Sequence, residues 1–287
     1  MRERDGSAIA FRVLWLAWAA LLALAMILGN QSGGHAAAAA TWARMGSSLV
    51  LVATGWVAFA LWRKSDAGRF SLWIAVGMTL GAIGDFFNAG LLNFIPLPDP
   101  VLGGIAAFGL GHIAYIVGCV GLGRRMNWLT TSPTASSNDE LHAPLSGETR
   151  TSSLARRACI ASAIIGWQLV GLVGWYLVAY CGSKNHDLVW PALPYSLLLA
   201  GTAGVASGLA VADRRFLPLA AGAALFLASD LILAFELFRG NFPYQSEAVW
   251  LTYGPGQMLI VFSTLVAARV VGTQVGRRGF GKRGQVQ

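Results

Sequence analysis

The sequence predicts an all-α polytopic membrane protein with about eight transmembrane helices, and two observations carry this prediction. Apolar residues make up 55% of the 287 residues and charged residues only 12%, whereas soluble domains average about 45–50% and about 25%. The apolar residues also form continuous runs long enough to cross a bilayer as helices, instead of the alternating segments of about ten residues that build a membrane barrel. We therefore expect a single transmembrane domain over residues 1–287.

The first four predicted helices are each bounded by charged or proline-rich residues. The first, 13–28, could instead be the apolar part of a signal peptide, but it is longer than the usual stretch of about 7 to 15 residues. The next predicted helices are 45–62, 70–92 and 101–122. Three prolines in residues 95–100 separate the last two, because proline cannot continue a helix.

A long polar segment, residues 126–157, separates these helices from the second set. It contains too few apolar residues to fold on its own, so we expect a flexible cytoplasmic loop there. Four more predicted helices follow, at 158–181, 191–212, 216–238 and 248–271. Residues 272–287 are predicted to form a basic cytoplasmic tail.

The positions of the basic residues test this order of helices. Starting with the N-terminus inside, all but three of the 21 Lys and Arg residues fall on the inner side, and the exceptions are Arg44, Lys184 and Arg239. Such an excess predicts an integral protein of the inner (plasma) membrane with both termini cytoplasmic. Because the basic residues cluster at the ends of apolar runs without interleaved aromatics, the net charge of +8 does not indicate a nucleic-acid partner.

Two aspartates lie within the apolar bodies of predicted helices. Asp85 and Asp230 are each about fifteen residues from the inner end of their helix, or roughly 22 Å at about 1.5 Å per residue. An ionisable group at such depth is costly unless it faces the bundle interior or a wet cavity. We expect the two carboxyls to meet, with one keeping its proton, so that an acid and a base lie side by side. The alternative is a polar contact that only fixes helix packing.

Few other polar residues fall inside the predicted helices. His112 is the single histidine among them, so a three-histidine zinc site is not expected, and Asp85, His112 and Asp230 remain only a weaker metal set. We predict no metal and no cofactor. Glu236 is expected to pair with Arg239 near the outer interface. Three cysteines without CxxC spacing argue against a disulfide framework.

A faint internal repeat accompanies the acids. Asp85 precedes His112 by 27 residues, and Asp230 precedes Gln257 by the same number. Two four-helix halves in parallel orientation would produce this spacing, although coincidence would produce it as readily.

Four short motifs occur in a recognisable order. They are Gly84-Asp85, Phe108-Gly-Leu-Gly-His112-Ile-Ala-Tyr115, Phe226-Leu-Ala-Ser229-Asp230-Leu-Ile-Leu-Ala and Leu251-Thr-Tyr253-Gly-Pro-Gly-Gln257. Together they resemble the YhhN-type lysoplasmalogenase family of eight-helix membrane proteins. Gly254-Pro255 departs from the aromatic and small residues that are more usual in the family.

The resemblance implies hydrolysis of the vinyl ether bond of a lysoplasmalogen, which gives a fatty aldehyde and a glycerophospho-base. The partners would then be a lysophospholipid and the bilayer that carries it. On this basis we expect Asp85 and Asp230 to be catalytic. The residues expected to bind or position substrate are His112, Tyr115, Tyr253, Gln257, Asn88 and Ser229.

Other functions remain open at this point. A proton- or cation-coupled transporter of a lipid or small solute would also use two acids within the membrane. A purely structural membrane protein would leave both acids unexplained.

Overall fold

The computed structural model describes residues 2–31, 34–126, 128 and 147–283. Its helices are α1 (Arg2–Gly29), α2 (Gly34–Trp62), α3 (Gly68–Asn88), α4 (Pro100–Arg125), α5 (Gly147–Trp175), α6 (His186–Ala212), α7 (Leu217–Arg239) and α8 (Gln245–Arg283). A π-helical turn, Tyr176–Tyr180, extends α5, and a 3₁₀ turn, Arg214–Phe216, precedes α7. Within the described residues, eight helices are long and apolar enough to cross a membrane and no strand occurs, which confirms the predicted fold class.

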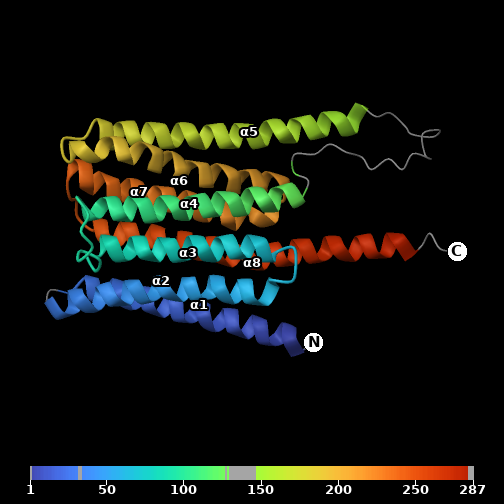
Figure 1. Ribbon diagram of the computed structural model, residues 1–287, viewed down its shortest axis with the longest axis horizontal. Helices are drawn as coiled ribbons and strands as arrows, with labels where there is room; N and C mark the ends of the chain where they lie inside the picture. The colour runs from blue at the N-terminus through green and yellow to red at the C-terminus, as the bar shows by residue number, and fades with distance from the viewer. Residues whose placement is uncertain (1, 32–33, 127, 129–146, 284–287) are drawn as a thin grey trace.

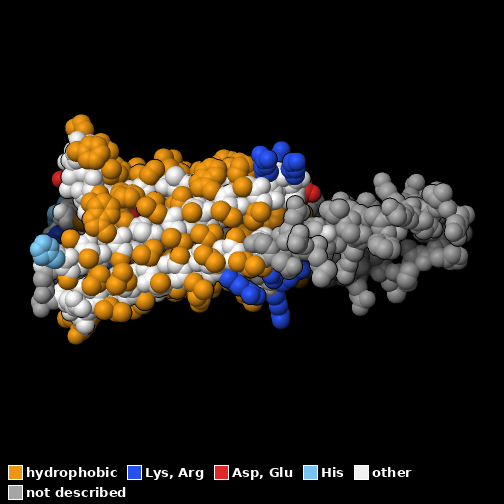
Figure 2. All heavy atoms as spheres, turned by 90° about the horizontal axis from the view of Figure 1, so that it is seen from below, with side chains coloured by type: hydrophobic (Ala, Val, Ile, Leu, Met, Phe, Trp, Pro, Cys, Tyr) orange, Lys and Arg blue, Asp and Glu red, His pale blue; other side chains and the backbone are white. Residues whose placement is uncertain are grey.

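The helices lie side by side in one bundle (Figure 1). In this view α5 forms one edge, α1 and α2 form the other, and both termini lie at the same end. We call this the terminal end, and the other the distal end. Apolar side chains cover the visible flank of the bundle, while Lys and Arg gather where this apolar surface meets the terminal end (Figure 2). This distribution fits a bundle that stands across a bilayer.

Several helices extend beyond their predicted ends. The structure starts α2 at Gly34, not at residue 45, because the alanine run 36–40 forms helix more readily than any other sequence. It starts α5 at Gly147, so residues 147–157 of the predicted loop are helical instead. Residues 127 and 129–146 of that loop lie outside the described part of the chain, as do 284–287 of the predicted tail, and α8 continues to Arg283.

The turn before the fourth helix follows the prediction closely. Asp99 caps α4, since its carboxylate accepts the Val101 backbone N–H at 2.9 Å, and Pro100 takes the first helical position. On the other side, α3 ends at Asn88, four residues before the predicted end, and the chain then adopts a positive φ of 71° at Gly90. These two ends place Asn88 at the distal end of the bundle.

The helices pair in the same order in both halves of the chain. In the first half α1 packs on α2, α2 on α3 and α3 on α4, while in the second half α5 packs on α6, α6 on α7 and α7 on α8. Between the halves, α2 contacts α8 and, correspondingly, α6 contacts α4. This is the arrangement expected of two four-helix halves in parallel orientation, and it makes α3 and α7 equivalent helices.

Candidate active site

Asp85 and Asp230 line one cavity of about 390 Å³ between α2, α3, α7 and α8. Asp85 is buried, with 5% of its surface exposed, and Asp230 is half-buried. Their carboxyl groups are near enough for their charges to interact. The structure therefore brings together the two acids that the sequence placed at one depth. The cavity is lined by Thr41, Arg44, Met45, Asp85, Asn88, Ala89, Phe108, Asp230, Leu233, Glu236, Ser246, Val249, Trp250 and Tyr253.

The cavity belongs to the distal half of the bundle. Thr41 lies near the start of α2, Asn88 is the last residue of α3, and Ser246 lies near the start of α8. All three helix ends are at the opposite end of the bundle from the chain termini (Figure 1). With both termini cytoplasmic, as the sequence predicts, the cavity would lie toward the outer side of the membrane.

Hydroxyl groups surround the Asp85 carboxylate. Ser48 of α2 donates a hydrogen bond to it at 2.6 Å, and the Tyr253 hydroxyl of α8 is a second hydrogen-bonding partner. The Gln257 amide in turn donates to the Tyr253 oxygen. This contact depends on Gly81, because a Cβ at that position would lie 3.2 Å from the Gln257 Nε2. Asp85 is thus fixed by groups from two neighbouring helices.

Asp230 has a corresponding set of hydroxyl partners. Tyr195 of α6 donates a hydrogen bond to its Oδ2. The Ser229 hydroxyl lies 3.3 Å from the other carboxylate oxygen and 2.8 Å from the Phe226 carbonyl. Each aspartate therefore lies on the third helix of its half and accepts a hydrogen bond from the second helix of the same half.

Aromatic rings form the floor of the cavity. Phe108 and Tyr253 line the cavity, and Phe226 packs edge to face against both from behind, with ring centroids 5.1 to 6.1 Å apart. Gly84 makes room for this cluster, since a Cβ there would lie 2.5 Å from the Phe108 ring. An apolar floor beneath two carboxyls limits their access to water and strengthens the electrostatic interactions above it.

Two of the predicted substrate-binding residues lie behind this floor. The His112 ring packs edge to face on Phe226 at 4.6 Å, and its Nδ1 lies 2.9 Å from the Thr202 hydroxyl. Tyr115 fills the space beside Gly77, where a Cβ would clash with its ring. Neither His112 nor Tyr115 is among the residues that line the cavity.

The other predicted residues lie closer to the acids. Tyr253 and Asn88 line the cavity, while Gln257 and Ser229 are buried and contact Tyr253 and Asp230 respectively. The structure thus divides the six predicted residues into two that face the cavity, two that hold groups facing it, and two that support the floor.

A second cavity of about 480 Å³ meets the first. The residues common to both are Asn88, Phe108, Asp230, Leu233 and Glu236. Its remaining walls come from α3, α4, α6 and α7 and from the segment that precedes α6, and apolar side chains such as Ile105 and Leu237 predominate. Asp230 therefore stands at the junction of the two cavities, whereas Asp85 lines only the first.

Arg44 is a site residue that sequence reasoning missed. Its guanidinium is half-buried in the first cavity and lies over the Trp250 ring, 5.6 Å from the centroid. It precedes Ser48 by one helical turn on α2, so both side chains face the same region. One signal pointed to it, since Arg44 is one of only three basic residues that the predicted topology places on the outer side.

Ser48 and Tyr195 were missed as well, and the internal repeat could have indicated them. Ser48 lies 37 residues before Asp85, and Tyr195 lies 35 residues before Asp230. The two separations differ by two residues, so a search at one fixed spacing would not have found this pair, whereas a search that allowed a difference of two residues would have included it.

The predicted ion pair between Glu236 and Arg239 does not form. Glu236 lines both cavities and accepts a hydrogen bond from the Gln245 amide at 2.6 Å. Arg239 instead donates to the backbone carbonyls of Leu177 and Cys181 at the end of α5. The Arg239 guanidinium satisfies backbone carbonyls at the end of the fifth helix, which lack partners within the helix. Glu236 is therefore left to face the cavity.

The described residues contain no group of three His, Cys, Asp or Glu side chains placed to hold a metal ion. All three cysteines are free. The ionisable groups that line the first cavity are the carboxyls of Asp85, Asp230 and Glu236 and the Arg44 guanidinium, together with the Tyr253 hydroxyl.

Comparison with known proteins identifies a family for the chain. No curated protein and no solved structure matches the chain. The model of the YhhN family matches residues 41–137 and 151–264, which include both aspartates, Arg44 and the hydroxyl groups around the acids. The match covers most of the sequence, and the chain belongs to the YhhN family.

Proposed function

We propose that this chain is a membrane hydrolase that cleaves the vinyl ether bond of a lysoplasmalogen. The observation that carries the proposal is the shared cavity, in which Asp85 and Asp230 interact above an apolar floor. The YhhN family membership supports a membrane protein of this type.

Two adjacent carboxyls supply what the reaction needs. A protonated carboxyl donates its proton to the alkene carbon distal to the ether oxygen, which leaves an oxocarbenium ion. The second carboxylate stabilises that cation and accepts a proton from the water that adds to it. The resulting hemiacetal breaks its carbon–oxygen bond, and the products are a fatty aldehyde and a glycerophospho-base with a free hydroxyl. One water is consumed, and no oxidant or reductant is needed.

Arg44 is placed to hold the phosphate of such a lipid. Its guanidinium can form two parallel hydrogen bonds with phosphate oxygens, and it shares the cavity with both acids. One helical turn, about 5.4 Å, separates it along α2 from Ser48, the residue bonded to Asp85. In the substrate, five covalent bonds separate the phosphorus from the vinyl ether oxygen, which is a comparable span.

The second cavity is suited to the alkenyl chain. It continues from Asp230 along apolar side chains of α4 and α7. A lysolipid with its phosphate at Arg44 and its chain in this cavity would pass between the two carboxyls. This pose puts the bond to be cleaved at the junction of the cavities.

The test is aldehyde release by purified protein in detergent. A lysoplasmalogen should yield aldehyde, whereas the matched lysolipid with a saturated alkyl ether should not, because it has no alkene to protonate. Absence of aldehyde with the vinyl ether lipid, from protein that remains monodisperse, would overturn the proposal.

The same assay separates the hydrolase from the transporter. Hydrolysis requires no gradient and proceeds in detergent, whereas transport is measurable only in sealed vesicles. Gradient-driven uptake in vesicles together with no aldehyde release in detergent would favour the transporter.

A further inference from the structure

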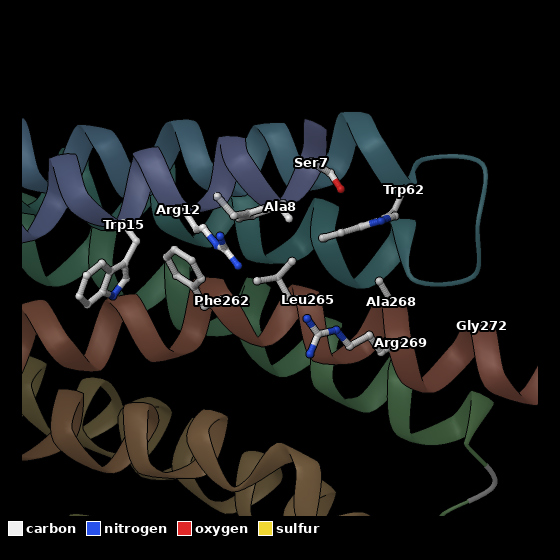
Figure 3. Close-up of a pocket in the computed structure, with 11 residues that line it drawn as sticks. Ser7, Ala8, Arg12, Trp15, Trp62, Phe262, Leu265, Ala268, Arg269 and Gly272 are labelled. Atoms are coloured by element: carbon white, nitrogen blue, oxygen red, sulfur yellow. The ribbon is translucent and has the colours of Figure 1, made fainter. Parts of the chain in front are cut away.

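A separate groove lies at the terminal end of the bundle, far from the two aspartates and from both cavities beside them. It is a groove of about 860 Å³ between α1 and α8 (Figure 3). We call it the α1/α8 groove, and it is lined by Ser7, Ala8, Phe11, Arg12, Trp15, Trp62, Phe262, Leu265, Ala268, Arg269 and Gly272.

The groove arises where α1 and α8 cease to touch directly. Nearer the distal end Gly254 lets α1 approach closely, since a Cβ there would lie 2.9 Å from the Leu22 side chain. Toward the terminal end aromatic rings fill the space instead. Phe11 stacks on Trp62 at 5.6 Å and packs edge to face on Phe262 at 5.9 Å. The groove therefore has a continuous apolar floor.

Two guanidinium groups face each other across this floor. Arg12 of α1 and Arg269 of α8 point into the groove from opposite sides (Figure 3). In the described part of the chain the ion pairs are Arg125 with Asp66 and Arg215 with Asp213, so neither groove arginine pairs with an acid there. No acidic residue is among the described residues that line the groove.

The depth of the two arginines matches the lipid headgroups. Arg12 directly precedes the apolar run 13–28, and Arg269 lies near the end of the apolar run 248–271. Long basic side chains at the ends of such runs extend toward the membrane interface. The neighbouring α1 side chains Val13 and Leu16 are about 60% exposed, so this face of the helix is turned to hydrocarbon.

We propose that the α1/α8 groove binds an anionic phospholipid, with its phosphate between Arg12 and Arg269 and its acyl chains over the aromatic floor. Two guanidiniums without an acidic partner among the described side chains favour a headgroup of net negative charge, and arginine binds phosphate oxygens in bidentate fashion. A lipid is the occupant because the groove joins these guanidiniums to an apolar floor on a bundle of membrane-spanning helices. Juxtamembrane arginines are also attracted to anionic leaflets in general, which the experiment must separate from a built site.

This inference is independent of the proposed hydrolysis. The groove is at the end of the bundle opposite the carboxyl cavity, and none of its residues lines that cavity. All of α1 and Arg269 also lie outside the two segments that match the family. The two arginines therefore lie outside the family match, while Trp62 and Phe262 of the floor lie within it.

The experiment measures lipid binding to purified, delipidated protein in nonionic detergent. Phosphatidylglycerol is titrated against phosphatidylcholine of the same chains, with bound lipid counted by native mass spectrometry and Tm recorded in parallel. Phosphatidylglycerol should bind more tightly and raise Tm more. Equal binding of the two lipids would overturn the proposal.

Two double variants that each remove two positive charges then distinguish binding in the groove from general electrostatic attraction of anionic lipid. Arg12→Gln with Arg269→Gln should weaken phosphatidylglycerol binding by about tenfold or more, because two charge-assisted contacts are lost. The control is Arg63→Gln with Arg214→Gln, two exposed arginines at the terminal end that do not line the groove, and it should change binding less than about twofold. An equal loss in the control pair would show that long-range charge alone attracts the lipid.

A third variant keeps both charges and tests the shape of the site. Ala8→Trp places a large ring in the groove and should abolish preferential binding of phosphatidylglycerol. Unchanged binding in this variant would contradict the proposed position of the lipid. Aldehyde release in detergent should be unaffected by all these changes, so failure of this inference and failure of the hydrolase proposal are distinguishable.

Discussion

The two halves of the bundle place an aspartate at equivalent positions but surround it differently. Asp85 of α3 is 5% exposed, lines one cavity and has Ser48 and Tyr253 as partners. Asp230 of α7 is half-buried and lines two cavities that meet beside it. The helix pairing is thus repeated, while the access to each carboxyl is not.

The difference gives the site a direction. The second helix of the first half carries Arg44 one turn from the residue that holds Asp85. The second helix of the other half carries Pro191 and Pro194 just before Tyr195, and beside it lies the largely apolar second cavity. The first half therefore presents a guanidinium, while the second cavity is mostly apolar, with Lys184 and Glu236 as charged residues in its lining, which suits a molecule with a polar head and an oily tail.

The largest effect is expected when each acid is neutralised separately, which tests whether both halves take part in the reaction. Asp85→Asn and Asp230→Asn should each lower aldehyde release by about 10²–10⁴-fold, since loss of a general acid or base costs that much. Both should keep the Tm of the parent protein within a few degrees. The matched control is Asp66→Asn, an exposed acid at the terminal end, which should retain activity. Full activity in either cavity variant would mean that the halves do not share the reaction.

Removal of the hydroxyl partners should have a smaller effect that differs between the halves. Tyr195→Phe should reduce kcat by roughly 10- to 100-fold, because hydrogen bonds to charged groups are worth about 1.5–3 kcal/mol. Ser48→Ala should cost less, since Asp85 retains the Tyr253 hydroxyl, whereas Asp230 without Tyr195 retains only the Ser229 contact at 3.3 Å. The control on α6 is Ser196→Ala, which removes a hydroxyl that donates to the Gly171 carbonyl. The opposite order of the two effects would reverse our ranking of the halves.

Arg44 tests whether the first half holds the polar head. Arg44→Gln should raise KM about tenfold and change kcat little, because a charge-assisted contact to the phosphate is lost in ground and transition states alike. Arg44→Lys should recover part of the affinity by restoring the charge without the bidentate geometry. Steady-state kinetics with one lysoplasmalogen measure both. A change confined to kcat would place the guanidinium at the reacting bond instead.

Ala234 tests whether the second half holds the tail. Ala234→Phe narrows the second cavity without altering any polar group. The ratio of kcat/KM for a long alkenyl chain over a short one should fall by roughly tenfold, the range expected when a few methylenes are excluded from an apolar pocket. If long and short chains lose activity equally, the chain lies elsewhere.

The smallest expected effect concerns the acids in the connections at the terminal end. Asp213 accepts hydrogen bonds from Arg215, and these hold the pKa of its carboxyl below the usual value of 3.8. Because the folded-state pKa is the lower one, the stabilisation is fully present above the unfolded pKa and is lost as the pH falls through the folded value. Asp213→Asn should therefore lower the stability by less than about 1 kcal/mol at neutral pH and by nothing in strong acid. Thermal unfolding at several pH values checks this, and an equal loss at low pH would exclude the ion pair as the cause.

The fold was largely predictable because lipid leaves the backbone few choices. A chain in hydrocarbon must satisfy its hydrogen bonds within each segment, so every apolar run of sufficient length becomes a helix. The ends were less predictable, as α2 shows. Residues 34–44 are too weakly apolar to extend a hydropathy run, yet their alanines propagate the helix.

The depth of the site residues along their helices was predictable, but the rotation of the neighbouring helices about their axes was not. The rise per residue placed Asp85 and Asp230 at one level, and they do share a cavity. Which side chains of α2 and α6 reach them depends on how those helices are turned about their axes, and that is set by packing with neighbours. Ser48 and Tyr195 were missed for this reason, and His112 was expected at the cavity but lies behind Phe226.

The junction at Asp230 has a consequence for turnover. Hydrolysis would split one amphiphile into a water-soluble fragment and an oily one, and each would begin its departure from a different side of the same carboxyl. Neither fragment has to pass the other on the way out. Separate exits of this kind would prevent the two products from obstructing one another and leave the middle of the passage clear for the next lipid.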